Sequence, residues 1–186
     1  MVNNWGENGP RPTPDPRVSA VVPAMGVSVR MPMECPPQAF WDLITSVERI
    51  GEFSPECVEA WWVDGFPAQA VGGRFEGRNR IEVEGVADEW IRPCDVVAYD
   101  PPRHFAYTVG DRFDGTPATR WTFRIAPSEF GCIVEQQFEH LPEGLSGLRL
   151  RAEQVEDAEA LIARRRTMLR EGMTQTLERI RRVLEA

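Results

Sequence analysis

The chain of 186 residues contains no lysine, and all 21 of its basic residues are arginine. This absence excludes a Walker A lysine, a Schiff-base lysine for pyridoxal phosphate and the phosphate-binding lysine of a protein kinase. The arginines are outnumbered by 29 acidic residues, which gives a formal net charge of −8. We therefore do not expect nucleic acid or an anionic membrane to be the main partner. Because the chain has no apolar run of 18 residues, we expect no integral membrane association either.

Cysteine and histidine are also scarce. The four cysteines fit neither C-x-x-C ligand pairs nor a dense disulfide framework, so we expect reduced thiols and a cytoplasmic protein. The two histidines, His104 and His140, have no recognised catalytic spacing, and we expect each to be structural or exposed. No nucleotide-binding, metalloprotease or calcium-loop motif occurs. We therefore expect no metal and no cofactor, and we assign no catalytic residue.

The first residues differ in composition from the rest of the chain. Five of the sixteen prolines lie within residues 1–25, with asparagine and glycine between them. Such a composition cannot bury enough apolar surface to order itself. We predict a disordered, proline-rich tail over residues 1–25 and one domain over residues 26–186.

The domain itself begins with alternating apolar and polar residues from Gly26, which predicts a strand. Two short helices are predicted next, one starting at Pro36 and one ended by Pro55. Turn residues then separate six further candidate strands, at 58–63, 73–80, 89–99, 103–109, 119–126 and 131–139. Residues 141–152 are either an irregular connection or a lid, and an apolar stripe predicts a long helix over 153–186. This order indicates an α+β fold, with a curved antiparallel sheet of about seven strands wrapped around the C-terminal helix.

Several segments carry a family resemblance when they are taken in chain order. They are residues 36–56, the strand GGRFEGRN (72–79), the turn and strand DPPRHFAY (100–107), residues 119–123 and residues 172–180. This series resembles the helix-grip proteins of the SRPBCC, or START-like, superfamily, and within it the bacterial polyketide cyclase/dehydrase and lipid-transport type. The resemblance covers residues 26–186. It implies a helix-grip fold that binds a hydrophobic small molecule in a cavity between the sheet and the C-terminal helix.

The expected cavity-lining residues come from the candidate strands and the last helix. They are Phe75, Asn79, Tyr107, Trp121, Phe123, Gln137, Leu169 and Met173. Asn79 would meet either a polar group of the ligand or a neighbouring backbone group. Tyr107 and Trp121 would either lie against a planar ligand or simply pack in the core. Gln137 shares a face of its strand with Glu135, and that face lines the cavity or points outward.

Three functions are consistent with these features. The first is binding of a polyketide-, lipid- or isoprenoid-like molecule. The alternative is a polyketide aromatase/cyclase or dehydratase, in which Asn79, Tyr107, Gln137 and an arginine polarise carbonyls or move protons. The third is a co-chaperone-like interaction protein that binds through the N-terminal tail or through the arginines at 164–166, although a solvated helix face is the simpler explanation of those arginines. A homodimer is compatible with all three.

Overall fold

Strands dominate the structure, a computed structural model that describes residues 11–22, 25–83 and 86–185. The strands are β1 (Gly26–Met33), β2 (Cys57–Trp62), β3 (Arg74–Val83), β4 (Val86–Asp100), β5 (His104–Gly110), β6 (Pro117–Ser128) and β7 (Gly131–His140). The helices are α1 (Pro16–Val21), α2 (Pro37–Thr45), the single 3₁₀ turn η1 (Val47–Arg49), α3 (Ile50–Phe53), α4 (Gly147–Ala152) and α5 (Ala158–Leu184).

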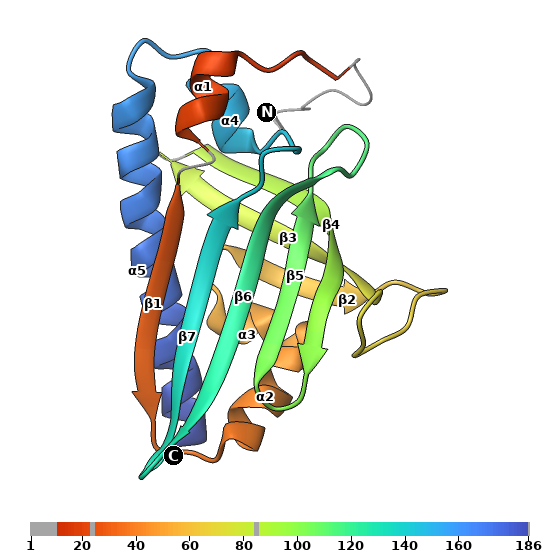
Figure 1. The fold of residues 1–186 in the computed structure, drawn as a ribbon, viewed down its shortest axis with the longest axis vertical. Helices are drawn as coiled ribbons and strands as arrows, with labels where there is room; N and C mark the ends of the chain where they lie inside the picture. Colours follow the sequence, from red (N-terminus) through yellow and green to blue (C-terminus); the bar gives the residue numbers. More distant parts are fainter. Residues whose placement is uncertain (1–10, 23–24, 84–85, 186) are drawn as a thin grey trace.

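All seven strands form one antiparallel sheet in the order β1-β7-β6-β5-β4-β3-β2. Neighbouring strands of the sheet are consecutive in the chain, with one exception: β1 pairs with β7. The sheet curves around α5, with α2 and α3 near the C-terminal end of that helix and α1 and α4 at the opposite end (Figure 1). The predicted α+β helix-grip fold is confirmed, including the long C-terminal helix and the short helices after the first strand.

One face of the sheet, called here the inner face, is turned toward α5. Strand β7 shows it most clearly, because buried and half-buried residues alternate along its whole length. The buried set is Cys132, Val134, Gln136, Phe138 and His140. Directly paired residues of antiparallel strands point to the same side of a sheet. Val29 of β1 and Phe123 of β6, which both pair with Gln136, therefore belong to the inner face as well.

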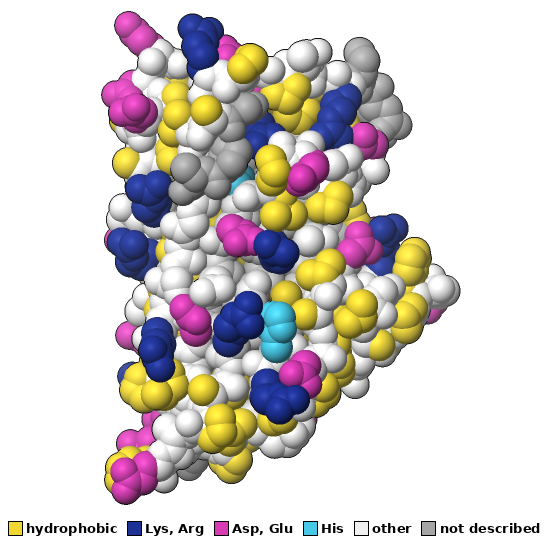
Figure 2. Space-filling model, viewed as in Figure 1, with side chains coloured by type: hydrophobic (Ala, Val, Ile, Leu, Met, Phe, Trp, Pro, Cys, Tyr) yellow, Lys and Arg dark blue, Asp and Glu magenta, His cyan; other side chains and the backbone are white. Residues whose placement is uncertain are grey.

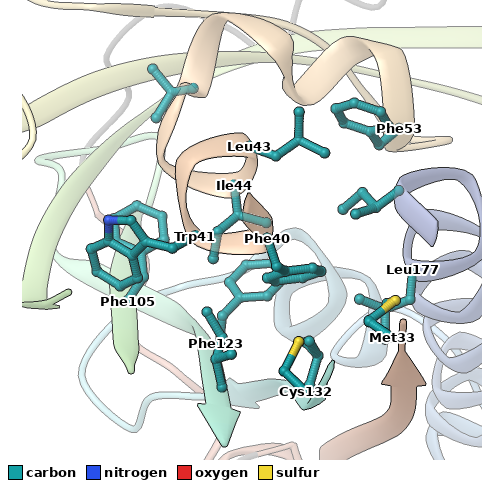
Figure 3. Packing of buried hydrophobic residues seen from close by; sticks show 14 of the residues in the cluster. Met33, Phe40, Trp41, Leu43, Ile44, Phe53, Phe105, Phe123, Cys132 and Leu177 are labelled. Carbon is teal, nitrogen blue, oxygen red and sulfur yellow. The ribbon is translucent and has the colours of Figure 1, made fainter. Parts of the chain in front are cut away.

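The buried side chains form two clusters. In the first cluster, α2 packs Phe40 against Phe123 and Trp41 against Phe105, with ring centroids 6.4 and 6.3 Å apart (Figure 3). The C-terminal part of α5 completes this cluster with Leu177 and Ile180. The second cluster surrounds the N-terminal part of α5 and contains Val22, Met25, Val27, Phe138, Ala152, Ile162, Leu169 and Met173.

The N-terminal segment differs from the predicted tail wherever the structure describes it. Asp15 caps α1 by accepting a hydrogen bond from the backbone N–H of Arg17 at 2.8 Å. Val22 and Met25 are completely buried in the second cluster, and Arg11 forms an ion pair with Asp111 at 3.2 Å. The segment cannot bury enough apolar surface by itself, but docking against the domain supplies the apolar contacts that it lacks. The rest of the predicted tail, 1–10 and 23–24, lies outside the described residues.

The connection after β7 contains a short helix, α4, between two loops. Ser146 caps this helix, and its side chain accepts a hydrogen bond from the backbone N–H of Arg149 at 3.2 Å. The Arg149 side chain is 1% exposed and donates to the carbonyl oxygens of Pro142 and Gly144 at 2.9 and 2.7 Å. Helix α5 then starts at Ala158, five residues after the predicted start at 153, because Asp157 caps it.

Candidate ligand-binding site

Four inner-face residues in the middle of the sheet keep solvent-accessible surface. They are Tyr107 and Val109 of β5 and Trp121 and Thr119 of β6, called here the inner junction. Tyr107 is paired with Trp121, and Val109 is paired with Thr119. Tyr107 packs against the first core cluster, whereas Trp121 packs against the second. The inner junction therefore lies where the two clusters meet, and its side chains are only half buried there.

The Tyr107 ring packs against two other aromatic rings, and its hydroxyl group is not paired. Its ring centroid lies 5.0 Å from that of Phe75 and 5.7 Å from that of Phe105. Burial, reinforced by the nearby thiols of Cys94 and Cys57, raises the pKa of the Tyr107 phenol well above its usual range. Within the part of the chain that the structure describes, the hydroxyl makes no hydrogen bond. The phenol is therefore neutral at physiological pH and free to donate to a bound molecule.

Trp121 has a similar combination of packing and an unused polar atom. Its ring meets that of Phe138 edge to face, with centroids 4.8 Å apart. An indole N–H can only donate a hydrogen bond. The N–H of Trp121 has no acceptor among residues 11–22, 25–83 and 86–185. The inner junction thus combines two aromatic rings with two unpaired donors.

Polar groups also lie on the inner face of β3 and β4. Asn79 is half buried, and its side-chain N–H donates to the carbonyl oxygen of Gly77 at 3.1 Å. Of the two predicted alternatives for Asn79, the backbone contact is therefore present, while its carbonyl oxygen has no partner in the described chain. Arg92 lies opposite Gly77, where no side chain occupies the neighbouring position. Burial and the positive charge of Arg112 lower the pKa of Arg92.

The prediction for Gln137 is wrong, because this residue lies on the outer face. The buried residues of β7 are the even-numbered ones, so Gln137 and Glu135 point away from α5. Glu135 accepts a hydrogen bond from the hydroxyl of Ser28 at 2.8 Å on that outer face. Acidic and basic side chains are interspersed across the same face (Figure 2). The amide that faces α5 belongs to Gln136, which is not among the predicted cavity-lining residues.

The other four predicted residues are buried rather than half exposed. Phe75 and Phe123 belong to the first cluster and Leu169 and Met173 to the second, and none is more than 7% exposed. They lie on the inner face of the sheet or on the sheet-facing stripe of α5. Phe75 contacts the ring of Tyr107 directly, so it supports one wall of the inner junction. Their contact with a ligand stays a prediction.

A buried imidazole lies beyond the inner junction, at the end of β7. His140 is 7% exposed, so it is structural rather than exposed. Burial and the positive charges of Arg149 and Arg165 lower the pKa of His140 to about 4. Arg165 donates to both carboxylate oxygens of Glu56, at 2.8 and 2.9 Å. The simple picture of a solvated arginine face at 164–166 therefore fails for Arg165, because this side chain connects α5 to the segment before β2.

Two general features bear on the class of site. No group of three or more His, Cys, Asp or Glu side chains in the described part of the chain could hold a metal ion. Within the same residues, no helix is both long and apolar enough to cross a membrane. The four cysteines are free thiols.

Comparison with known proteins identifies relatives of this architecture. Residues 25–185 match the family described as polyketide cyclase/dehydrase and lipid transport. No curated protein matches the chain. Among solved structures, the Polyketide_cyc-like protein Cgl2372 from Corynebacterium glutamicum is 27% identical, with a TM-score of 0.60 and coverage of 86% of this chain and 91% of that one. Protein MLL2253 from Mesorhizobium loti is 18% identical, with a TM-score of 0.57 and coverage of 87% and 97%.

One further structure is larger than this chain. The di-domain ARO/CYC StfQ from the steffimycin biosynthetic pathway is 12% identical and has a TM-score of 0.64. The match covers 86% of this chain and 50% of StfQ. At this identity the similarity shows a shared fold.

Proposed function

Because the chain belongs to the polyketide cyclase/dehydrase and lipid transport family, we propose that it binds a hydrophobic small molecule between the inner face of the sheet and α5. One observation carries the proposal: the inner junction keeps accessible surface between two fully buried clusters. Side chains in the middle of a filled core touch protein on every side. Those of the inner junction do not, which supports a space that a ligand fills.

The chemistry of the inner junction indicates what such a ligand offers. Tyr107 and Trp121 present aromatic rings, which favour a planar apolar body. Each ring also carries one unpaired donor, so a ligand with an oxygen atom is better accommodated than a pure hydrocarbon. Polyketide-, lipid- and isoprenoid-like molecules all supply an apolar body, and those with an aromatic or conjugated ring system also supply the planar shape.

A neutral fluorescent probe tests the binding function. N-phenyl-1-naphthylamine emits strongly only in an apolar environment, so titration with the protein measures its Kd. We expect saturable binding to the wild type and a Kd about tenfold higher in Trp121→Leu, because an aromatic contact worth roughly 1.4 kcal/mol is lost. Trp61→Leu is the matched control, because Trp61 lies on the opposite face of the sheet, opposite Glu76 of β3.

Two results would contradict the proposal. One is the absence of saturable probe binding to the wild type, and the other is an equal Kd for the two tryptophan variants. Native mass spectrometry of the protein purified from its own cells adds an independent measurement. A co-purified molecule of a few hundred daltons would identify the ligand directly.

The Tyr107 hydroxyl favours one second function, intramolecular cyclisation of a polyketide. In such a reaction a methylene carbon loses a proton to water and attacks a carbonyl carbon of the same chain, and the new carbon–carbon bond closes the ring. The carbonyl oxygen takes up a proton, and later loss of water leaves a double bond in the ring. A neutral phenol with no protein partner is suited to donate a hydrogen bond to that carbonyl oxygen. The test is to incubate a synthetic 3,5,7-trioxo thioester with the wild type, with Tyr107→Phe and without protein. An unchanged product distribution in all three would reject the cyclase for this substrate.

A further inference from the structure

Gln136 is a buried amide that makes no hydrogen bond. Its side chain lies on the inner face of β7, and the residue is 5% exposed. No described residue donates to it or accepts from it. Its Oε1 atom is fully enclosed and has no partner. Its Nε2 atom also has no partner but keeps some solvent-accessible surface. A buried amide N–H group without an acceptor is costly, and only Nε2 is open to a partner from outside the described chain.

The surroundings of Gln136 are apolar on every strand that borders it. Val134 and Phe138 flank it on the inner face of β7, and Val29 and Phe123 lie directly opposite on the neighbouring strands. Leucine or methionine would fill the same position without leaving polar atoms unpaired. Packing alone therefore does not explain a glutamine at this position, and no described side chain is arranged to satisfy it.

Gln136 lies within reach of the inner junction. Phe123 is its direct neighbour on β6, so Trp121, two residues away on the same face, is its diagonal neighbour. Diagonal neighbours across antiparallel strands have Cβ atoms roughly 7–8 Å apart, a distance that long side chains bridge. A molecule that lies against the Trp121 ring therefore comes close to the Gln136 amide.

We propose that the ligand carries a carbonyl or hydroxyl oxygen that accepts a hydrogen bond from Nε2 of Gln136 while its apolar body lies against Trp121. This assignment rests on the proposed binding function and adds the chemistry that the site selects. It makes Gln136 the residue by which the site distinguishes an oxygenated planar molecule from a hydrocarbon of the same shape.

A pair of probes matched in shape tests the assignment. 2-Acetylnaphthalene carries a ketone where 2-ethylnaphthalene carries only a methylene group, and displacement of bound N-phenyl-1-naphthylamine measures the Kd of both. The variants are Gln136→Met, which keeps the length of the side chain and removes the amide, and Gln137→Met as the matched control on the outer face. We expect the wild type and Gln137→Met to prefer the ketone by about three- to tenfold in Kd, the range of one neutral hydrogen bond. In Gln136→Met the preference for the ketone should disappear or reverse, because a buried ketone oxygen without a donor is costly.

The outcomes separate this assignment from the binding function. Equal Kd values for the two probes in the wild type, or a preference that persists in Gln136→Met, would overturn the role of Gln136 and leave hydrophobic binding intact. If the wild type binds neither probe, the binding function fails and the assignment fails with it. Two further measurements do not depend on how the variant binds. The carbonyl stretch of 2-acetylnaphthalene should move to lower frequency in the wild-type complex than in hexane, and ligand-free Gln136→Met should melt at or above the wild-type Tm. An unshifted stretch or a clearly lower Tm would count against the assignment.

Discussion

His140 should make the stability of the protein depend on pH in a window that its own titration defines. Its pKa is about 4 in the folded protein, compared with 6.5 for an unperturbed histidine. Because the folded pKa is lower, the unfolded chain takes up the proton first as the pH falls. The free energy of unfolding should therefore be unaffected above about pH 7, should decrease between about pH 6.5 and 4, and should stop decreasing from this cause below about pH 4.

The size of this effect follows from the shift itself. A difference of about 2.5 pKa units, at 1.36 kcal/mol per unit, corresponds to roughly 3 kcal/mol. Two structural causes support a value of this order. His140 is 7% exposed, and the guanidinium groups of Arg149 and Arg165 are close enough to oppose a second positive charge. A loss of about 3 kcal/mol is a large fraction of the 5–15 kcal/mol that is typical of a small domain.

Urea denaturation at several pH values between 4 and 7.5 measures this effect when the wild type is compared with His140→Phe. The variant keeps an aromatic ring against Phe138, whose centroid lies 5.2 Å away, but cannot bind a proton. Titration of the carboxylates is common to both proteins and cancels in the difference. We expect the wild type to lose about 3 kcal/mol more than the variant between pH 7.5 and 4. His104→Gln is the matched control, because His104 lies on the outer face of β5, and it should keep most of the wild-type slope.

Two results would refute this reasoning. One is a free-energy difference between the wild type and His140→Phe that does not change with pH. The other is a pKa of 6 or above for His140 when its ring protons are titrated by NMR in the folded protein. Either result would mean that the imidazole is hydrated or paired with an acceptor in solution.

The remaining predictions concern the N-terminal segment, the thiols and one tight packing contact. Arg11→Ala should lower the free energy of unfolding in urea by about 1–2 kcal/mol, because it removes the ion pair and hydrogen bonds that hold this segment to the β5–β6 loop, whereas Arg17→Ala, a side chain that is 90% exposed, should leave it unchanged. Burial raises the pKa of Cys57 to about 11 and that of Cys132 to about 12, so a disulfide reagent at pH 8 should label both slowly in the folded protein and quickly in urea, and fast labelling of the folded protein would contradict the burial. Gly51→Ala should lower the Tm, because a Cβ atom there would clash with the backbone carbonyl oxygen of Val58 in β2, at a cost of about 1–3 kcal/mol, and an unchanged Tm would show that α3 moves freely away from β2.

The order and type of the main elements could be predicted from the sequence because they depend on local periodicity. Alternation placed Tyr107 on the same face as Phe105, and a period of 3.6 residues placed Leu169 and Met173 on one stripe of the last helix. These residues lie on the inner face and on the sheet-facing side of α5 in the structure. The family resemblance carried the same information, because its segments build the strands, turns and helix that every member shares.

The face of β7 that lines the interior was not available from local periodicity. Gln136 and Gln137 are both amides in an alternating strand, so the pattern shows only that they point to opposite sides. Pairing of β7 between β1 and β6 then decides which side faces α5. A prediction that started from the polar pair Glu135 and Gln137 selected the outer side.

Long-range contacts decided the remaining features. The composition of residues 1–25 predicted disorder, but the Val22 side chain is buried. The residues that bury it lie more than 100 positions further along the chain, for example in α5. The low pKa of His140 likewise depends on burial by the folded chain and on Arg149 and Arg165, which belong to two different helices. The sequence by itself determined which residues share a face, because neighbours in the chain set the period of a helix or strand. Only the tertiary structure decided what each face meets, because burial, charge and hydrogen-bond partners come from segments that are distant in the chain.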